Sequence, residues 1–551
     1  MKAFPLSLLA LGGTLLLASC RFEYRNREAD LIVRNARIFS MDDAGTEHTA
    51  MAIKDGRILE LGAEYQILNR YRAKKTYDAA LQLIYPGFID GHAHFLGLGL
   101  ARNKVNLTGA KSWDEVLDRV TAFAETHGDG GWLLGRGWDQ NLWPDRTEPV
   151  NDRLNALFPD RPVLLQRVDG HAALANQKAL EMAGLTPGLR IPGGKLVERD
   201  GRLTGLLLDN AVERVEQVIG EADAAAKRLA LLGAQRECLA AGLTMVCDAG
   251  LDAGTVEVLK QMEQAGELKI RLYAMLSDDT ANFRAFGGGP HLGELLQVRA
   301  VKCYADGALG SRGALLLQPY SDDPAAGHGL QLSPREHFVE VARWCKEHGF
   351  QMATHCIGDS ANRLILGVYG EVLGGTNDLR WRIEHAQCTD PADMPLFGRY
   401  NIIPSMQPTH ATSDMLWAVD RLGPQRLANA YALKRLMRQN GMIALGTDFP
   451  VEGIDPLVTF YAAVIRKNGD GLPEGGFQMA DALGREEALR GMTIWNAVAT
   501  FNEEDLGSLE PGKKADFVVV DRNLLTVDEA QLLKARVQAT FINGEQVWPL
   551  R

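Results

Sequence analysis

The sequence predicts an α/β protein in which a (β/α)8 TIM barrel is joined to a small β-sandwich domain built from both chain termini. Short apolar runs alternate with helical sequence through the middle of the chain. Both ends instead show the apolar–polar alternation of strands that are buried on one face. Residues that commonly bind metal ions follow several of the central runs. Together these three observations predict the fold class.

The composition is that of a large globular protein. Hydrophobic residues make up 46% and charged residues 23% of the 551 positions, which excludes a disordered chain, a fibre and a multi-span membrane protein. The formal net charge of −11 gives no electrostatic basis for nucleic-acid binding, so we expect a small-molecule partner. Seven cysteines are too few for a disulfide framework, and most are expected to be buried thiols. The oligomeric state is open, with a homodimer the commonest assembly.

Residues 1–20 resemble a lipoprotein signal peptide. An early Lys2 precedes an apolar run that ends in Leu-Ala-Ser-Cys20 and is too short to span a bilayer. In bacterial lipoproteins such a cysteine is lipidated, so Cys20 would anchor the protein in the bacterial cell envelope, facing the periplasm. Arg21 after the cysteine favours the outer membrane over the inner one. The alternative is an ordinary secretory signal that is cleaved, with an incidental cysteine.

Both ends of the chain are predicted to form small antiparallel sheets. Residues 31–62 alternate between apolar and polar positions, with Asp55-Gly56 as a hairpin signal. The C-terminal stretch around the turn signal Asn543-Gly544 has the same character. Because neither fragment can bury a core alone, we expect residues 21–84 and 501–551 to pair into one domain.

Eight apolar runs between these ends predict the barrel strands, since parallel strands covered on both faces are almost continuously hydrophobic. The runs are Leu83–Asp90, Thr244–Asp248, Ile270–Leu276, Val298–Tyr304, Gln351–His355, Arg380–His385, Asn401–Met406 and Met442–Asp448. We assign a ninth run, Pro162–Val168, to an insertion of about residues 100–235 after the first strand. The barrel would occupy residues 85–500, with its active site at the C-terminal ends of the strands.

Ligand-type residues lie where such a barrel would place its active site. The first run leads into His92-Ala-His94, whose spacing points both imidazoles to the same side of a strand. Four further runs end in residues suited to a metal site: Lys302, His355, His385 and Asp448. Because imidazole and carboxylate groups are the usual ligands of Zn²⁺ and related ions, these strand ends predict a metal centre.

The motifs around these residues resemble those of the amidohydrolase superfamily. The matching segments are Tyr85-Pro-Gly-Phe-Ile-Asp-Gly-His-Ala-His94, Val301-Lys-Cys-Tyr-Ala-Asp-Gly307, Ala353-Thr-His-Cys-Ile-Gly-Asp359, Arg382-Ile-Glu-His-Ala386, Gly446-Thr-Asp-Phe-Pro450 and Gly507-Ser-Leu-Glu-Pro-Gly-Lys-Lys-Ala-Asp-Phe517. The resemblance is to amidohydrolase family 3, the branch with a long insert after strand one that includes N-substituted formamide deformylase-like enzymes. It implies a metal-dependent hydrolase that cleaves a non-peptide C–N bond in an amide, formamide or cyclic imide.

The resemblance also implies which residues bind the metal. His92 and His94 would hold the more buried ion together with Asp448, and His355 and His385 would hold a second. One or two divalent ions are therefore expected. Zn²⁺ is the first candidate, although imidazole and carboxylate ligands also suit Mn²⁺ and Fe²⁺.

Two residues would take part in the chemistry at these ions. Binuclear members of the family use a carboxylated lysine to bridge the metals, and Lys302 lies at that position. An unmodified ammonium would be repelled by two cations, so Lys302 fits the site only as a neutral amine or a carbamate. A metal-activated hydroxide would attack the substrate carbonyl. Asp448 would act as general acid/base, taking the water's proton and delivering it to the leaving nitrogen.

Residues of the insertion and of the loop after the fourth strand are candidate substrate contacts. His171 resembles a residue that reaches over the pocket in this branch, where it would touch the substrate carbonyl or leaving group; the alternative is a local hydrogen bond. Trp138 would form a substrate wall or belong to the core. Asp306 and Arg312 would form a substrate loop, with Arg312 either a clamp for a carboxylate or a structural residue. Two carboxylates would orient metal ligands: Asp209 and Asp359.

Two other functions remain open on the sequence alone. A mononuclear-metal deaminase would use the same strand ends, with Lys302 in a structural role. A lipid-anchored ligand-binding protein would use a degenerate barrel without catalysis. The complete set of histidines with Asp448 argues against the second, and the number of bound ions separates the first from a binuclear hydrolase.

Palmitate labelling in bacterial cells tests the lipid anchor. We expect the wild-type chain to incorporate label and Cys20→Ala to incorporate none, because the substitution removes the thiol that would carry the acyl chain. Equal labelling of the two chains would contradict the anchor.

Overall fold

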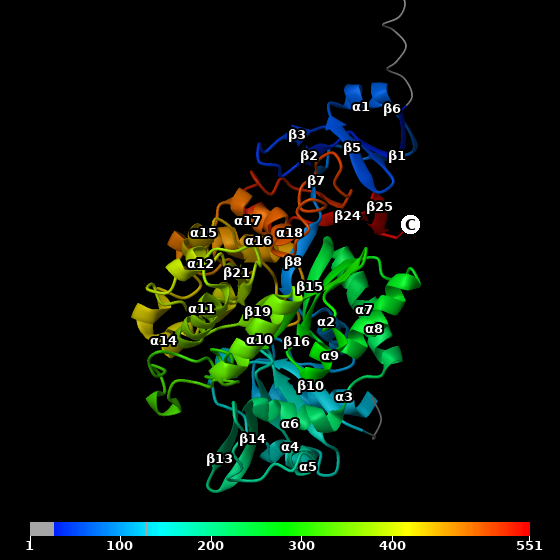
Figure 1. Ribbon diagram of the computed structural model, residues 1–551. Coiled ribbons are helices and arrows are strands. Elements are labelled where there is room, and N and C mark those ends of the chain that lie inside the picture. The colour runs from blue at the N-terminus through cyan, green and yellow to red at the C-terminus, as the bar shows by residue number, and fades with distance from the viewer. Residues whose placement is uncertain (1–26, 127–130, 551) are drawn as a thin grey trace, which may run out of the picture.

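The computed structural model describes residues 27–126 and 131–550. The predicted signal peptide, with Cys20, lies outside these residues, so the lipid anchor stays a prediction. Figure 1 shows three parts in a row: strands from the blue and red ends of the chain, the barrel, and the cyan-to-green insertion on the far side of the barrel. Within the described ranges, no helix combines the length and apolarity that crossing a membrane requires.

Within the described residues, eight parallel strands form the predicted barrel, which is confirmed. Their order in the sheet is β22-β21-β20-β19-β18-β16-β15-β8. The strands are β8 (Phe88–Ala93), β15 (Leu243–Leu251), β16 (Arg271–Ser277), β18 (Leu296–Tyr304), β19 (Gln351–His355), β20 (Arg382–Glu384), β21 (Ile403–Met406) and β22 (Ala444–Leu445). The segment after β22 joins the end of β8, because the N–H of Asp448 donates to the carbonyl of His92 at 2.8 Å. The N–H of His94 likewise donates to the carbonyl of Phe449 at 2.8 Å.

Helices surround the barrel, and its strands are buried. The helices are α2 (Phe95–Ala101), α7 (Ala224–Ala240), α8 (Ala253–Gln264), α9 (Thr280–Ala285), α10 (Arg335–His348), α11 (Asp359–Leu373), α12 (Pro395–Arg399), α13 (Pro408–Asp414), α14 (Ala418–Leu427), α15 (Leu433–Asn440), α16 (Pro456–Ile465), α17 (Arg485–Gly491) and α18 (Ile494–Ala499). All six cysteines in the described residues are buried free thiols, as the composition predicted. One short strand, β17 (His291–Leu292), pairs antiparallel with β18.

The run Leu83–Asp90, expected as one barrel strand, is divided between two sheets. Its first half, β7 (Leu83–Pro86), pairs with strands of the terminal domain, and its second half begins β8. The break falls at Gly87, where a Cβ atom would lie 2.2 Å from the hydroxyl oxygen of Thr244. Only glycine fits this close approach, so the chain can pass directly from one sheet into the next.

The insertion forms a separate six-stranded sheet with its own core. Its strands are β9 (Val105–Asn106), β10 (Leu133–Trp138), β11 (Val163–Arg167), β12 (Ala172–Ala175), β13 (Gly194–Arg199) and β14 (Arg202–Asp209). Its helices are α3 (Trp113–Thr126), α4 (Asp152–Leu157), α5 (Gln177–Met182) and α6 (Asn210–Ile219). The run Pro162–Val168 therefore belongs to the insertion, as predicted. Helix α7, expected at the end of the insertion, instead packs on the barrel, where the carbonyl of Ala230 leaves no space for a side chain at Gly99.

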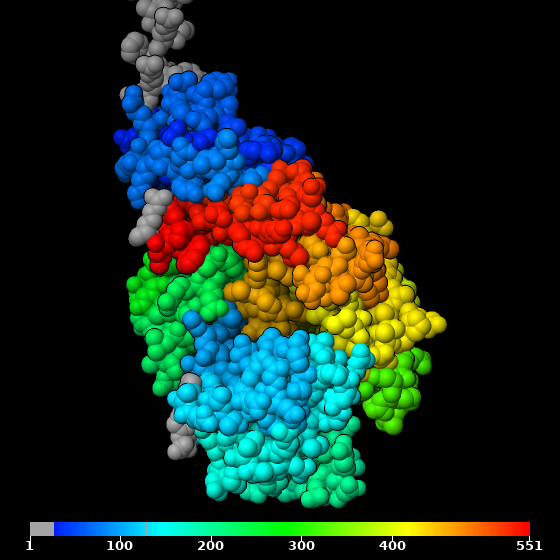
Figure 2. Space-filling model, turned by 180° about the vertical axis from the view of Figure 1, so that it is seen from behind, coloured from blue at the N-terminus to red at the C-terminus, as the bar shows by residue number. Residues whose placement is uncertain are grey.

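Strands from both chain termini share one sheet, with the order β25-β24-β23-β7-β2-β3. These strands are β2 (Arg37–Phe39), β3 (Glu47–His48), β23 (Phe517–Val520), β24 (Val537–Ile542) and β25 (Glu545–Trp548), together with β7. A second sheet contains β1 (Arg27–Arg34), β4 (Ala50–Lys54), β5 (Arg57–Gly62) and β6 (Tyr71–Asp78), next to α1 (Glu64–Arg70). The two sheets bury one core, in which Val33 and Ile53 pack with Phe517 and Phe541. In Figure 2 the red C-terminal segment lies between the blue strands and the barrel.

A buried ion pair joins the terminal domain to the barrel. Arg271, the first residue of β16, donates from Nε to Oδ2 of Asp516 at 2.6 Å and from Nη2 to Oδ1 at 3.1 Å. Its Nη2 also contacts Oδ1 of Asn543 at 2.6 Å. Both charged side chains are almost fully buried, so each depends on the other for its charge to be compensated.

We expect Asp516→Asn to destabilise the fold by about 3–5 kcal/mol, because it removes the buried charge partner of Arg271. Glu294→Gln is the matched control. The Glu294 carboxylate lies 3.7 Å from Nη1 of Arg271 but is 64% exposed, so its loss should cost no more than about 1 kcal/mol. The midpoint of urea unfolding measures both variants, and equal shifts would contradict this role of the pair.

Candidate metal centre and active-site cavity

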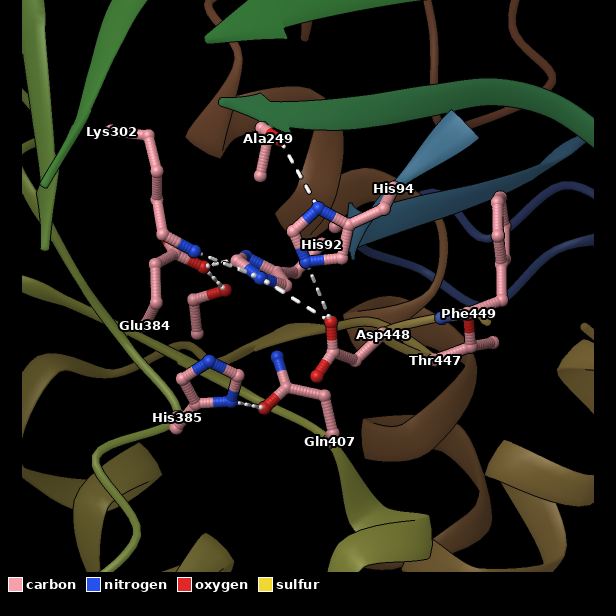
Figure 3. Close-up of polar contacts among 12 residues, drawn as sticks. His92, His94, Ala249, Lys302, Glu384, His385, Gln407, Thr447, Asp448 and Phe449 are labelled. Carbon is pink, nitrogen blue, oxygen red and sulfur yellow. Dashed lines mark hydrogen bonds and ion pairs between the residues drawn. The ribbon is translucent and has the colours of Figure 1, made fainter. Parts of the chain in front are cut away.

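The C-terminal ends of the barrel strands bring together side chains from distant parts of the sequence (Figure 3). In chain order the predicted ligands are His92 and His94 at β8, Lys302 in β18, His355 ending β19, His385 after β20 and Asp448 after β22. His385 and Asp448 have positive φ angles of 69° and 62°. This backbone conformation is unfavourable for residues other than glycine and is commonly retained at functional sites. Here it ends the strands and turns both residues into the site.

In the described part of the chain, two groups of three side chains could each hold a metal ion, and Asp448 belongs to both. The first is His92, His94 and Asp448, and the second is His385, His410 and Asp448, with the ligand atoms of each group within 4.8 Å of one another. Oδ1 of Asp448 lies 3.3 Å from Nε2 of His94 and 3.7 Å from Nε2 of His92. Its Oδ2 lies 3.5 Å from Nε2 of His410. The two carboxylate oxygens therefore face different groups.

The chemistry of these groups fits divalent metal ions. Oδ1 of Asp448 and Nε2 of His410 are buried and have no hydrogen-bond partner in the described chain, which is costly unless a ligand satisfies them. Burial lowers the pKa of His92 to about 4 and that of His385 well below its usual value, so both rings are neutral and can donate a lone pair. Burial opposes ionisation of Asp448, but the surrounding imidazoles of His94, His92 and His410 hold the pKa of that carboxyl well below its usual range.

A buried carboxylate orients His92 from behind. Nδ1 of His92 contacts Oε2 of Glu384 at 2.6 Å, which leaves Nε2 facing Asp448. Glu384 accepts from Nε and Nη2 of Arg382 at 2.7 and 2.9 Å and from the hydroxyl of Ser405 at 2.7 Å. Burial alone would raise the pKa of Glu384, but the Arg382 guanidinium and His92 hold it well below its usual range. An ionised partner of this kind fixes the ring orientation and tautomer of a metal-binding histidine.

Neutral oxygens orient two more of these histidines, His94 and His385. Nδ1 of His94 contacts the carbonyl of Ala249 at 3.1 Å, and Nδ1 of His385 contacts Oε1 of Gln407 at 2.6 Å. In both rings Nε2 is left as the free nitrogen. Glu384 and Gln407 were not among the residues predicted from the sequence, although both lie at strand ends: Glu384 ends β20, and Gln407 directly follows β21.

Lys302 lies inside this centre, as predicted. Its Nζ is 3.2 Å from Nε2 of His92 and 4.6 Å from the ring centroid of Tyr304, and the side chain is fully buried. Burial lowers the pKa of Lys302 to about 8, which increases the fraction of neutral amine. Carboxylation requires the neutral amine, so this setting supports the carbamate, which stays a prediction.

The second group contains His410 in place of the predicted His355. Nε2 of His355 lies 3.7 Å from Oδ1 of Asp306, and the ring centroid is 4.6 Å from that of His385. This nitrogen is buried without a hydrogen-bond partner among the described residues, so His355 stays a candidate ligand beside the group. His410 was missed, although it follows β21 by four residues, just as the other ligands follow their strands.

A cavity of about 990 Å³ opens over the metal centre and is closed on one side by the insertion. His171 lines this cavity, with its ring centroid 4.8 Å from that of His355. Its Nδ1 contacts Oδ1 of the buried Asp209 at 2.8 Å, which leaves Nε2 free. Burial would lower the pKa of His171, but the Asp209 carboxylate outweighs it and raises the pKa. Asp209 thus orients a cavity histidine rather than one of the residues of the two metal groups.

Trp138 and Arg312 do not line the cavity, which corrects their expected substrate contacts. Trp138 is 1% exposed, belongs to the core of the insertion and donates from Nε1 to the carbonyl of Leu165 at 2.7 Å. Arg312 contacts Oδ2 of Asp322 at 2.9 Å and Oε1 of Glu148 at 3.4 Å. Its charge is therefore compensated within the protein, and it does not act as an anion clamp.

Asp306 and Asp359 organise loops and do not line the cavity, although Oδ1 of Asp306 also lies 3.7 Å from Nε2 of His355. Asp306 is fully buried and accepts from the backbone N–H groups of Leu315, Ile357 and Gly358 at 2.7–2.9 Å. Asp359 accepts from the backbone N–H groups of Leu317, in the segment after β18, and of the adjacent Ser360. Both carboxylates are absent from the cavity lining, since their oxygens are used to hold the backbone after β18 and β19.

A family model described as "Amidohydrolase family" matches residues 75–548. The chain belongs to the amidohydrolase family. It is 34% identical over 545 residues to Protein LONG AFTER FAR-RED 3 of Arabidopsis thaliana, covering 95% of this chain and 92% of that protein. It is 24% identical to the N-substituted formamide deformylase of Arthrobacter pascens, covering 94% and 97%. A metal-dependent hydrolase from Pyrococcus horikoshii has a similar crystal structure, with a TM-score of 0.74, 29% identity and coverage of 91% and 99%. This amidohydrolase is thus a metal-dependent hydrolase whose candidate ligands lie at the strand ends.

We expect His410→Gln to bind about one metal ion fewer per chain than the wild type, because it removes a ligand from the second group. His337→Gln is the matched control. His337 lines the same cavity, but its Nε2 is held by Oδ2 of Asp278 at 2.7 Å. Elemental analysis of protein loaded with Zn²⁺ measures the content, and an unchanged content in His410→Gln would contradict its role as a ligand.

Proposed function

We propose that this amidohydrolase hydrolyses a non-peptide C–N bond in an amide, a formamide or a cyclic imide, with a small molecule as substrate. The observation that carries this proposal is the position of Asp448, whose two oxygens face two separate groups of imidazoles. The family, which includes a relative named for the deformylation of N-substituted formamides, supports the type of bond.

His92, His94 and Asp448 would hold one ion, and His385 and His410 would hold another with Asp448, beside Lys302 and His355. Zn²⁺ is the expected ion. When bound, such ions lower the pKa of water and polarise a carbonyl oxygen, which favours hydrolysis.

Asp448 is the proton carrier of the proposed reaction. Its carboxyl is ionised and its Oδ1 has no hydrogen-bond partner within the described chain, so it can accept a proton from the attacking water. It then donates this proton to the leaving nitrogen, which must be protonated for the C–N bond to break. Because Asp448 is buried and held by the backbone bond to His92, the carboxylate stays in place through both transfers.

His171 would stabilise the substrate from the opposite side. The Asp209 carboxylate holds Nδ1, so Nε2 of His171 faces the cavity beside His355. The raised pKa of His171 favours the protonated ring, which can donate to the carbonyl oxygen as negative charge develops on it. In this role the insertion completes the active site of the barrel.

We expect Asp448→Asn to lower kcat by about 10²–10⁴-fold, because the amide cannot carry the proton between water and leaving group. Asp359→Asn is the control, since this carboxylate contacts loop backbone away from the cavity and should retain turnover. Amine or ammonia release from a panel of amides, formamides and cyclic imides measures both variants. Unchanged kcat in Asp448→Asn would contradict the proposed role.

The same panel tests the reaction class when aminopurines and aminopyrimidines are included. Hydrolysis of an amide, formamide or imide by the metal-loaded wild type supports the proposal. Release of ammonia from the heterocyclic amines alone, with one bound ion per chain, would replace it with a deaminase.

A further inference from the structure

Two cationic side chains of the insertion line the cavity without a carboxylate partner. Arg136 lies in β10, and Lys104 precedes β9. Among the described residues, no carboxylate oxygen comes within 4.0 Å of either cation, although both lie in a wall that contains several carboxylates. The neighbouring Arg167 shows the contrast, because Asp139 and Asp169 both bind its guanidinium.

Most of the hydrogen-bond donors of these two cations are unused. Nη2 of Arg136 donates to the carbonyl of Val168 at 3.1 Å, whereas its Nε is buried without a partner. Nζ of Lys104 donates to Oε1 of Gln166 at 3.1 Å. A guanidinium has five N–H donors and an ammonium three, so the pair can still donate several bonds to a ligand. A buried donor without an acceptor is unfavourable, and an anion in the cavity would satisfy it.

The electrostatic environment of the pair favours an anion. Burial lowers the pKa of Lys104, and the charge of Arg136 lowers it further. Burial also lowers the pKa of Arg136, against the opposing effect of the carboxylates of Asp448, Asp169 and Glu216, none of which contacts the guanidinium. A negative ligand in direct contact with the pair would stabilise both charges.

The loop that carries His171 connects this pair to the metal centre. Gly170 packs against Arg136, where a Cβ atom would lie 3.4 Å from Nη1. The next residue, His171, has its ring centroid 4.8 Å from that of His355. A ligand bound to Arg136 would thus lie beside His171, in the cavity that Asp448 also lines.

We propose that Arg136 and Lys104 form an anion subsite that binds a carboxylate of the substrate, so that the substrate is a carboxylate-bearing amide. That the bound carboxylate belongs to the substrate rests on the proposed hydrolysis. The anion subsite itself is independent of that proposal. The planar guanidinium can bind both oxygens of a carboxylate. Glu216, which accepts from Nε2 of Gln166 at 2.6 Å, adds negative charge nearby and disfavours a dianion such as phosphate. The pair takes the clamp role that the sequence suggested for Arg312.

Matched acid and amide ligands test the subsite by isothermal titration of the zinc-loaded protein. N-formylglycine and N-formylglycinamide have nearly the same shape and differ in charge. The N-formyl derivatives of 4-aminobutyrate and 6-aminohexanoate, with their amides, extend the reach of the carboxylate. We expect at least one acid to bind more tightly than its amide, and Arg136→Met to weaken that acid by about 10- to 100-fold while leaving the amide unchanged.

Control variants separate the anion subsite from general effects on folding. Arg312→Met removes an arginine that is paired elsewhere, so it should leave the affinity for both ligands unchanged. Lys104→Met should weaken the same acid, and Arg136→Lys should retain part of the binding. Equal binding of acid and amide at all three lengths would overturn the proposal, as would a preference for the acid that Arg136→Met and Lys104→Met do not change. Tighter, Arg136-dependent binding of inorganic phosphate would overturn the assignment to a carboxylate.

Amine release measured on the same ligands distinguishes this proposal from the proposed function. Arg136-dependent binding without hydrolysis of any acid or amide would leave the subsite standing and count against C–N hydrolysis of these compounds. Hydrolysis of acids and amides at equal rates, unchanged in Arg136→Met, would support the hydrolase and reject the subsite.

Discussion

The backbone N–H of Asp448 donates to the carbonyl of His92 at 2.8 Å, and this bond joins the last strand of the barrel to the first. Asp90 reinforces it, because its carboxylate accepts from the N–H of Thr447 at 3.1 Å and from the Thr447 hydroxyl at 2.7 Å. Gly446 allows this approach, since a Cβ atom there would lie 2.5 Å from the backbone nitrogen of His92. The same backbone contact therefore closes the barrel and places Asp448 between the two groups of imidazoles.

The insertion contributes the other half of the active site. The barrel alone provides the metal ligands at its strand ends, but the wall that faces them carries His171, Arg136 and Lys104. The insertion has its own sheet and core, so its side chains approach the metal centre on a rigid support. In the proposed reaction the barrel would provide the chemistry, and the insertion would contact the substrate.

Some polar side chains around the cavity have partners within the protein, and others do not. We assign structural roles to the first kind and functional roles to the second. Arg312 and Arg167 contact carboxylates of the protein, Asp306 accepts from backbone N–H groups, and all three organise loops. Asp448 and Arg136 each have a buried polar atom without a partner among the described residues. Both line the cavity, where a metal ion or a substrate can supply what the protein does not.

The sequence by itself determined the barrel, the mixed origin of the terminal domain and most of the metal centre. Strands buried on both faces are almost continuously apolar, so polar residues near their ends stand out in the sequence. His92, Lys302, His385 and Asp448 could therefore be predicted as site residues from the sequence alone. The tertiary structure decided which residues come into close contact and which polar side chains find a partner. Gly87 divides the first predicted strand because Thr244 lies against it, which no local pattern shows. His410 lies in the second candidate metal group, and Arg136, rather than Arg312, lacks a carboxylate contact. Both results depend on which side chains become neighbours when the barrel closes and the insertion folds over it, and the sequence pattern does not contain this information.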